Sequence, residues 1–174
     1  MTDRQTPDAR GDDADLPTVV SIVGPSGAGK TSLVEALVAA LDDRSVATIK
    51  SIHHDIEPDT PGTDTHRHRT AGADTAVGIT PGLTFEVSRG GKGSDRDDTD
   101  AELAALRRTL EQLVERGFDI VLVEGFSAAP LPTIHVGEDD RTDSNRIGTG
   151  EDSIDTLLSA IEALDPVDPG TLSD

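Results

Sequence analysis

The sequence feature that most constrains this chain is a glycine-rich stretch, GPSGAGKT, at residues 24–31. A continuous apolar run at 18–23 precedes it, and leucines and valines at helical spacing over 31–41 follow it. The stretch matches the pattern G-x-x-x-x-G-K-[ST], and it lies between an expected strand and an expected helix, which is the context that this pattern requires. The sequence therefore predicts a loop that binds phosphate, in preference to a glycine-rich turn that only caps a helix.

The residue types of this loop suit a nucleotide that is bound together with magnesium. Glycines let the backbone wrap a phosphate without Cβ clashes, and the start of the following helix supplies positive potential. We expect Lys30 to reach the β- and γ-phosphates as a candidate catalytic residue, and the Thr31 hydroxyl to bind Mg²⁺. The nucleotide-binding residues predicted in the loop are Gly24, Pro25, Ser26, Gly27, Ala28, Gly29, Lys30, Thr31 and Ser32.

The stretch DIVLVEG at residues 119–125 is the expected second half of the site. Glu124 lies at the carboxyl end of this strand, where open α/β sheets bind their ligands, and Asp119 lies at the opposite end. We therefore expect Glu124 to hold Mg²⁺ with Thr31, and Asp119 to be a solvated strand start. The alternative is that Glu124 only caps a turn.

A polar segment rich in histidine and arginine starts at residue 50, at the carboxyl end of an expected strand over 46–50. In the favoured interpretation it overhangs the phosphate site: Asp55 approaches Mg²⁺ and takes part in catalysis, while a basic cluster meets the anion. The nucleotide-binding residues predicted in this segment are His53, His54, Asp64, Arg67 and Arg69. A histidine metal site is a second interpretation, although the spacing is not the helical i, i+4 pair of a zinc site. A solvated loop without a task is the third.

Strand, loop, helix and strand within residues 18–50 form a βαβ unit, which implies parallel strands and a right-handed crossover. Alternating segments around Pro81-Gly82 predict a hairpin, and no strand is expected after Val136. The fold class is therefore α/β: a P-loop NTPase with a mostly parallel twisted sheet flanked by helices, and a β-hairpin extension. Other expected elements are a short helix at 66–71, hairpin strands at 75–79 and 83–87, a helix at 99–116 that starts with a Thr99–Glu102 capping box, strands at 119–123 and 131–136, and a helix at 154–164.

Composition limits the partners and the setting. The formal net charge is −19, and this acidic excess disfavours nucleic acid and anionic membranes as partners. We expect a folded protein adapted to a salty cytoplasm, where charges are screened, rather than a disordered acidic chain. Cysteine is absent, which excludes disulfides and thiolate sites. We expect a disordered acidic tail at 1–16, a nucleotide-binding domain at 17–165 and a flexible tail at 166–174.

Three stretches in this order resemble the MobB family, the molybdopterin-guanine dinucleotide biosynthesis proteins B: the P-loop, VATIKSIHHDIEPDTPGTDTHRHRTAGA at 46–73, and DIVLVEGFSAAPLPTIHV at 119–136. The resemblance runs from about residue 19 to residue 136. Two residues depart from the family's pattern, since Ser51 stands where a histidine is frequent and Ser127 where a lysine is common.

The resemblance implies a GTP-binding P-loop protein that is usually dimeric and has weak intrinsic GTPase activity. Its implied role is that of an adaptor for a MobA-type guanylyltransferase, which joins GMP to molybdopterin. It implies that Gly27, Gly29, Lys30 and Thr31 bind phosphate and Mg²⁺, and that Asp55, Asp64 and Glu124 surround the site. Because the sequence has no N-K-x-D motif, guanine rests on the resemblance alone.

Two other functions stay open. A P-loop small-molecule kinase needs arginines on a closing lid, and Arg89 and Arg96 flank an expected flexible segment at 89–98. Arg107 and Arg108 are on a helix whose apolar stripe favours packing on a sheet instead. A structural module without nucleotide is the third possibility, and a Lys30→Ala protein that binds GTP unchanged would favour it.

Overall fold

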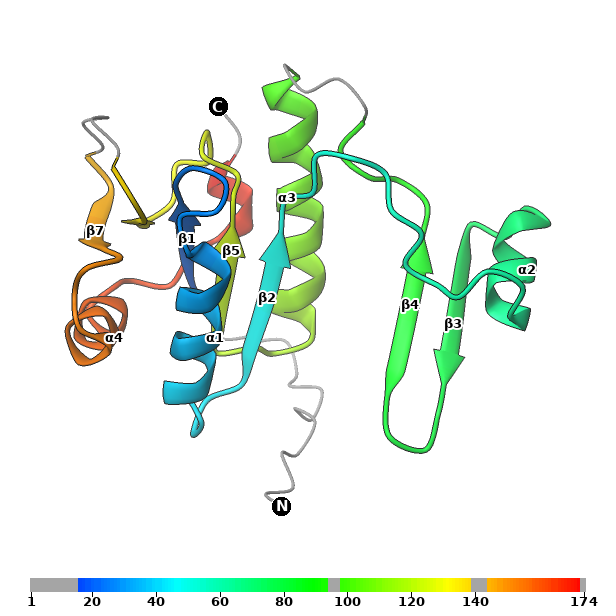
Figure 1. The fold of residues 1–174 in the computed structure, drawn as a ribbon, viewed down its shortest axis with the longest axis horizontal. Helices are drawn as coiled ribbons and strands as arrows, with labels where there is room; N and C mark the ends of the chain where they lie inside the picture. Colours follow the sequence, from blue (N-terminus) through cyan, green and yellow to red (C-terminus); the bar gives the residue numbers. More distant parts are fainter. Residues whose placement is uncertain (1–15, 94–97, 139–143, 173–174) are drawn as a thin grey trace.

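The computed structural model describes residues 16–93, 98–138 and 144–172 (Figure 1). The predicted acidic tail at 1–16 lies outside these ranges except for its last residue, and so does the middle of the flexible connection predicted at 89–98. Within the described ranges, no helix has the length and apolar character needed to cross a membrane.

A five-stranded parallel sheet, in the order β2-β5-β1-β6-β7, forms the body of the molecule. The P-loop strand β1 is at its centre, and β5 pairs with it from Thr18 opposite Ile120 to Ile22 opposite Glu124. This register brings the carboxyl ends of both strands to the same edge, where α/β sheets bind ligands. The strands are β1 (Thr18–Val23), β2 (Val46–Lys50), β5 (Ile120–Glu124), β6 (Thr133–His135) and β7 (Arg146–Thr149).

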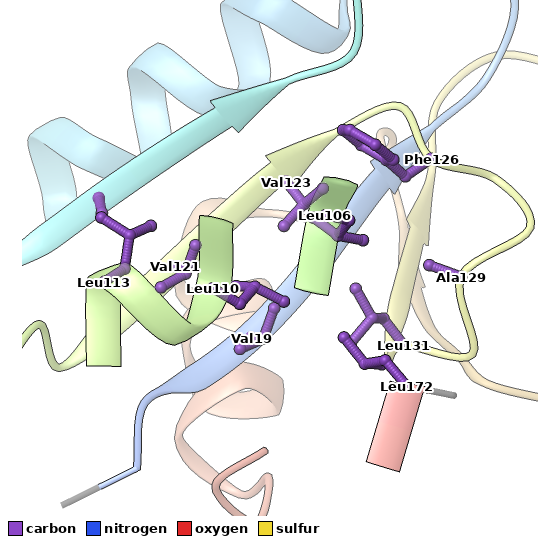
Figure 2. Packing of buried hydrophobic residues seen from close by; sticks show 11 residues of the cluster. Val19, Leu106, Leu110, Leu113, Val121, Val123, Phe126, Ala129, Leu131 and Leu172 are labelled. Carbon is purple, nitrogen blue, oxygen red and sulfur yellow. The ribbon is translucent and has the colours of Figure 1, made fainter. Parts of the chain in front are cut away.

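Helices cover both faces of the sheet, because successive strand residues point to opposite faces and are apolar on each of them. On one face α3 (Thr99–Glu115) and the 3₁₀ helix η1 (Pro169–Leu172) pack with Val19 and Val121, as Figure 2 shows. On the other face α1 (Lys30–Ala40) and α4 (Ile154–Glu162) pack with Val20 and Leu122. The two apolar layers fix the sheet edge that carries the P-loop.

A smaller unit, which we call the arm, consists of α2 (Asp64–Thr70), β3 (Thr75–Ile79) and β4 (Thr84–Ser88). Its two strands pair antiparallel as the predicted hairpin, and α2 packs on β3. Figure 1 shows the arm standing beside the sheet, joined to it by the chain before α2 and the chain after β4. Ala76 is the one buried hydrophobic residue among the described residues of the arm, so the arm has almost no core of its own.

Three local predictions were wrong. β7 is a fifth parallel strand inside the predicted loop at 137–150, where no strand was expected. The predicted tail at 166–174 includes η1, whose Leu172 is buried against the α3 face. The helix α3 is capped by Asp98, whose side chain accepts from the amide of Ala101 at 2.9 Å, and not by a Thr99–Glu102 capping box.

Candidate nucleotide-binding site

The glycine-rich loop joins β1 to α1 at the centre of the sheet edge. Gly24 lies so close to β6 that an added Cβ would come 2.0 Å from the Val136 carbonyl oxygen, and its φ is +146°. Only glycine fits there. The Lys30 ammonium donates to the carbonyls of Gly24 and Pro25 at 2.9 and 2.6 Å, which keeps it inside the loop. The loop thus places a cation and the first amides of an 11-residue helix together.

Glu124 faces the loop from the neighbouring strand. The Thr31 hydroxyl lies 3.1 Å from both Glu124 carboxylate oxygens, so it donates to this carboxylate. Lys50, opposite Glu124 in the β2–β5 register, donates to Glu124 Oε1 at 2.6 Å. The Glu124 side chain is 12% exposed and that of Lys50 is 52% exposed. A hydroxyl and a carboxylate side by side at a P-loop are the oxygen ligands that Mg²⁺ prefers.

The chain turns sharply after Glu124. Gly125 has φ +96°, and a Cβ there would come 2.8 Å from Ser51 Cβ, so glycine lets the ends of β5 and β2 touch. The Ser21 hydroxyl donates to the Gly125 carbonyl at 2.9 Å. Phe126 then adopts a left-handed φ of +55°, a strained conformation for a residue with a side chain. Its ring is buried in the α3-side core (Figure 2), which holds the turn in place.

These elements enclose a cleft of about 450 Å³ beside the P-loop. It opens at the carboxyl ends of β1, β2 and β5, the position of ligand sites in open α/β sheets. The residues that line it are Gly24, Ser26, Lys30, Lys50, Ser51, Ile52, His53, His54, Glu124, Gly125, Phe126 and Ser127. Both predicted histidines are in the segment 51–54, which lines this cleft and which we call the cleft wall. The histidine pair therefore lies at the phosphate loop, as expected.

The rest of the predicted overhang is elsewhere. Asp55 is exposed and does not line the cleft. Asp64, Arg67 and Arg69 are on α2, in the arm, and none of them lines the cleft either. The prediction that this whole segment lies over the phosphate site does not hold within one chain, because the connection at 51–63 carries it away from the sheet (Figure 1).

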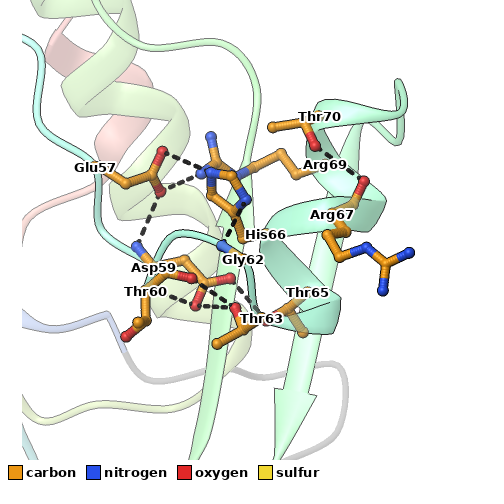
Figure 3. Close-up of polar contacts among 10 residues, drawn as sticks. All are labelled: Glu57, Asp59, Thr60, Gly62, Thr63, Thr65, His66, Arg67, Arg69 and Thr70. Carbon is orange, nitrogen blue, oxygen red and sulfur yellow. Dashed lines mark hydrogen bonds and ion pairs between the residues drawn. The ribbon is translucent and has the colours of Figure 1, made fainter.

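Polar contacts inside the arm explain why its basic residues are there (Figure 3). Arg69 donates to the Glu57 carboxylate, and His66 Nε2 lies 3.7 Å from the same carboxylate. The bond from Arg69 comes first among the influences that lower the pKa of Glu57, and the bond from Thr65 likewise lowers the pKa of Asp59. Arg67 pairs with Asp64 at 3.6 Å. The basic cluster thus has acidic partners from its own connection.

A second polar cluster closes the arm against the body. Lys92 donates to Glu102 Oε1 at 2.6 Å and to the Ser51 hydroxyl, which itself lies 2.9 Å from Glu102 Oε1. Burial alone would raise the pKa of Glu102, but the bonds from Lys92 and Ser51 outweigh it, and the pKa is lowered from its ordinary 4.5. These bonds therefore favour the charged form of the carboxylate.

Sequence reasoning missed the roles of several of these residues, and the lysines had a signal that could have been used. Lys50 and Ser51 lie two to three positions before His53, at the end of the strand next to the one that carries Glu124. Lysine is also rare, since it occurs only at positions 30, 50 and 92, and all three side chains lie at or beside the cleft. Asp119, expected to be solvated, instead accepts from the Ser45 amide at 2.8 Å and fixes the turn into β2.

The described residues contain no group of three or more His, Cys, Asp or Glu side chains placed to hold a metal ion. A nucleotide site does not require one, because Mg²⁺ there is bound by one or two protein oxygens together with phosphate oxygens and water. Thr31 and Glu124 provide such a pair, at 3.1 Å from each other. The site therefore fits a nucleoside polyphosphate with Mg²⁺.

A parallel sheet with a phosphate loop after its central strand, and a carboxylate on the adjacent strand, defines the P-loop NTPase fold. Within this class, the sequence pattern of the MobB family, described as Molybdopterin guanine dinucleotide synthesis protein B, matches residues 19–160. The chain belongs to this family.

Named relatives and solved structures agree with this assignment. The chain is 32% identical over 111 residues to the Molybdopterin-guanine dinucleotide biosynthesis adapter protein of Escherichia coli, covering 63% of this chain and 59% of the relative. It is 33% identical over 111 residues to the Putative molybdopterin-guanine dinucleotide biosynthesis adapter protein of Methanocaldococcus jannaschii, covering 64% of this chain and 42% of the relative. The chain thus matches less than two thirds of the length of these relatives.

Bacillus subtilis MobB has the same fold, with a TM-score of 0.60 at 21% identity over 84% of this chain and 99% of that one. A crystal structure of molybdopterin-guanine biosynthesis protein B gives a TM-score of 0.55 at 22% identity over 83% of this chain and 98% of that one. At this level of sequence identity, the two comparisons show a shared fold and nothing more.

Proposed function

We propose that the chain is a GTP-binding adaptor that assists the formation of molybdopterin guanine dinucleotide, with weak GTPase activity at most. The observation that carries the proposal is the contact between the Thr31 hydroxyl and Glu124, whose side chain lines the cleft beside the P-loop. It joins a magnesium site to a phosphate site in a member of the MobB family. The names of the relatives, which are adapter proteins of molybdopterin-guanine dinucleotide biosynthesis, indicate the pathway.

The roles that we assign to the residues of the site follow from their charges. Lys30 neutralises the β- and γ-phosphates, and Thr31 and Glu124 hold Mg²⁺. Lys50 offsets the charge of Glu124 and lines the same cleft, which makes it a further cation for the phosphates. In a chain of net charge −19, two lysines in one cleft give the local field that a polyphosphate needs.

Slow hydrolysis is proposed because the cleft offers little to activate water. Among the described residues that line it, Glu124 is the one carboxylate, and Thr31 and Lys50 already engage it. His53 and His54 are the remaining groups that could position a water molecule. A nucleotide held in this way serves binding or switching better than rapid turnover.

Guanine is proposed over adenine on the basis of family membership. The test is equilibrium binding of GTP and ATP, each with Mg²⁺, to the wild-type chain in molar KCl. We expect GTP to bind clearly tighter than ATP, and the Glu124→Gln protein to lose most of the Mg²⁺ dependence. A preference for ATP would contradict the guanine assignment.

The kinase alternative has less support. Arg89, a candidate lid residue, lies 3.8 Å from Asp74 at the base of the arm, and Arg96 lies outside the described residues. Transfer of phosphate from ATP to a stoichiometric small-molecule acceptor would favour the kinase. Slow release of inorganic phosphate from GTP without an acceptor favours the adaptor.

We propose two partners. The first is a second copy of the chain. A two-stranded ribbon has two unpaired edges and is marginally stable alone. The ribbon in the arm also exposes apolar side chains, with Val77 50%, Leu83 59% and Ile79 82% exposed. Pairing with the arm of a second copy would cover them.

Sedimentation equilibrium in molar KCl tests the homodimer. We expect Ile79→Lys to give a monomer at concentrations where the wild-type chain is a dimer. Leu16→Lys is the matched control, because it places the same charge on an exposed apolar side chain of the body. A wild-type monomer, or a dimer unaffected by Ile79→Lys, would contradict this interface.

The second partner is the guanylyltransferase that attaches GMP to molybdopterin, with molybdopterin or other maturation proteins present in the same assembly. We place this assembly in the cytoplasm. Titration of the chain with the guanylyltransferase, with and without GTP and Mg²⁺, measures the affinity between the two proteins. Binding that strengthens with GTP supports a nucleotide-dependent adaptor, and no binding in either condition contradicts the adaptor role.

A further inference from the structure

The two connections between the arm and the body are tied together where they leave the sheet. The outgoing connection starts at Ser51, directly after β2, and the returning connection after β4 carries Lys92. Lys92 donates to the Ser51 hydroxyl and to Glu102 on the first turns of α3. The arm packs mainly on itself, through β3 with β4 and α2 with β3. Its attachment to the body therefore depends strongly on this cluster.

The Lys92 ammonium has three hydrogens and meets three polar neighbours. Besides Ser51 and Glu102, His53 Nδ1 lies 3.4 Å away. The Lys92 and Glu102 side chains are only 20% and 21% exposed, and the ammonium lies 5.5 Å from the centre of the Phe126 ring. Partial burial strengthens such charge-assisted bonds relative to surface ion pairs. A compact ammonium with three donors fits this arrangement better than a planar guanidinium.

The same cluster borders the proposed nucleotide cleft through Ser51. Ser51, His53 and Phe126, the neighbours of Lys92, all line that cleft. Lys92 therefore helps to fix the cleft wall at 51–54, together with the Ser51 amide, which donates to the Glu124 carbonyl at 2.8 Å. Lys92 and Glu102 themselves do not line the cleft.

We propose that Lys92 is a positioning residue that holds the cleft wall at 51–54 and thereby couples the orientation of the arm to nucleotide binding. The proposal rests on the nucleotide binding proposed above. It assigns to the cluster of Lys92, Glu102 and Ser51 a task that the P-loop residues do not perform: a change at the arm alters the affinity for nucleotide, and a bound nucleotide restrains the arm.

Glu102→Ala gives the sharpest test, because two explanations predict opposite changes in the affinity for nucleotide. Removing one negative charge from a chain of net charge −19 should tighten polyphosphate binding if only the overall field matters. Releasing Lys92 and the wall should weaken it, by about tenfold for the loss of a charge-assisted bond. The matched control is Glu111→Ala on the same helix, whose carboxylate pairs with Arg107 at 3.6 Å and is half exposed.

A second pair of variants removes the cation instead. Lys92→Met keeps the chain length over Phe126 without the charge, and Lys92→Arg keeps the charge. We expect weaker GTP binding for Lys92→Met, partial recovery for Lys92→Arg, and little change for the control Arg89→Met, which removes a cation paired with Asp74 on the same connection.

The orientation of the arm is measured through the distance between two spin labels, one on the body and one on the arm. The chain has no cysteine, so Glu35→Cys on α1 and His68→Cys on α2 label the body and the arm alone, in a sample diluted with unlabelled chain. We expect Glu102→Ala to broaden the distance distribution, and GTP with Mg²⁺ to narrow it in the wild-type chain.

The outcomes separate the two proposals. A wild-type chain that binds GTP, with unchanged affinity in Glu102→Ala and Lys92→Met, overturns the coupling and leaves the proposed function intact. A broadened distribution with unchanged affinity also overturns it, since the cluster would then be structural only. A wild-type chain that binds no nucleotide overturns the proposed function and the coupling together.

Discussion

The body and the arm of this protein are held together by different physics. The body buries complete apolar side chains on both faces of a parallel sheet, among them Leu37, Leu110 and Leu122, all 0% exposed. The arm buries Ala76 and is held by the pairing of β3 with β4, and by ion pairs and hydrogen bonds from α2 to Glu57 and Asp59 of the preceding connection (Figure 3). Contacts between apolar side chains carry no charge for salt to screen, whereas salt screens and weakens exposed ion pairs.

This difference separates the rigid part of the site from the adjustable part. The phosphate loop and Glu124 are on core strands whose positions are fixed by packing. The wall at 51–54 starts at Ser51, whose amide donates to the Glu124 carbonyl of β5, and it continues into the connection to the arm, where Lys92 bonds the Ser51 hydroxyl. We infer that the proposed nucleotide site and the arm meet at the short segment 51–54. The predictions below test this difference between the two regions.

Salt should have the largest effect, and it should stabilise the body more than the arm. Molar KCl screens the self-repulsion of a chain with net charge −19, so we expect the body to unfold in dilute buffer and to fold as KCl is added. Circular dichroism against KCl concentration measures this. A chain that is fully folded and equally stable at low salt would contradict the interpretation of its acidity.

Within folded samples, hydrogen exchange should show that added salt protects the amides of β1 and β5 more than those of 57–70. The reason is that the ion pair of Arg69 with Glu57 is partly exposed and is weakened by screening. Equal gains in protection for both segments would argue that the arm is held as the body is.

A core substitution is next in size. Leu110→Ala removes a fully buried side chain from the α3 face of the sheet, and we expect it to lower the free energy of unfolding by about 2–5 kcal/mol. Arg69→Ala should lower it by less than about 1 kcal/mol, because it removes a partly exposed ion pair in the arm. Urea titration in molar KCl compares them, and similar losses would remove the distinction between the regions.

Much of the body was predictable, because continuous apolar runs such as 18–23 and the regular leucines of α3 carry their own signal. β7 was not, since RIGT contains one apolar residue and becomes a strand only by pairing with β6. In the site, Gly24 to Thr31 and Glu124 follow from local pattern and strand direction. The bond from Lys92 to Ser51 spans 41 positions and a glycine-rich connection, so no local pattern could reveal it.

Acid should loosen the arm and its attachment before it unfolds the core. The pKa values of Glu57 and Glu102 are lowered in the fold, from an ordinary 4.5, chiefly through Arg69 for Glu57 and, against burial, through Lys92 for Glu102. A lowered pKa contributes stability that is present above 4.5 and is lost as pH falls through the value in the fold. We expect hydrogen exchange at 51–70 to rise below pH 4.5 relative to its intrinsic rate, and the rise at 57–70 to be smaller in Glu57→Gln.

The smallest effect is expected at Arg67, which sequence reasoning assigned to the nucleotide. Its side chain is 72% exposed and pairs with Asp64 on the arm, away from the cleft. We therefore expect Arg67→Ala to change GTP affinity by less than about twofold, as for an exposed surface charge. A tenfold loss would show that α2, of this chain or of a second copy, reaches the bound nucleotide.

The most direct test of the account is the equilibrium binding of GTP with Mg²⁺, in molar KCl, to the wild-type chain and to Lys30→Ala. The account predicts tight binding that falls by about a hundredfold or more in the variant, because Lys30 supplies the cation at the phosphates. The same affinity in both proteins, or no binding to the wild-type chain, would contradict it.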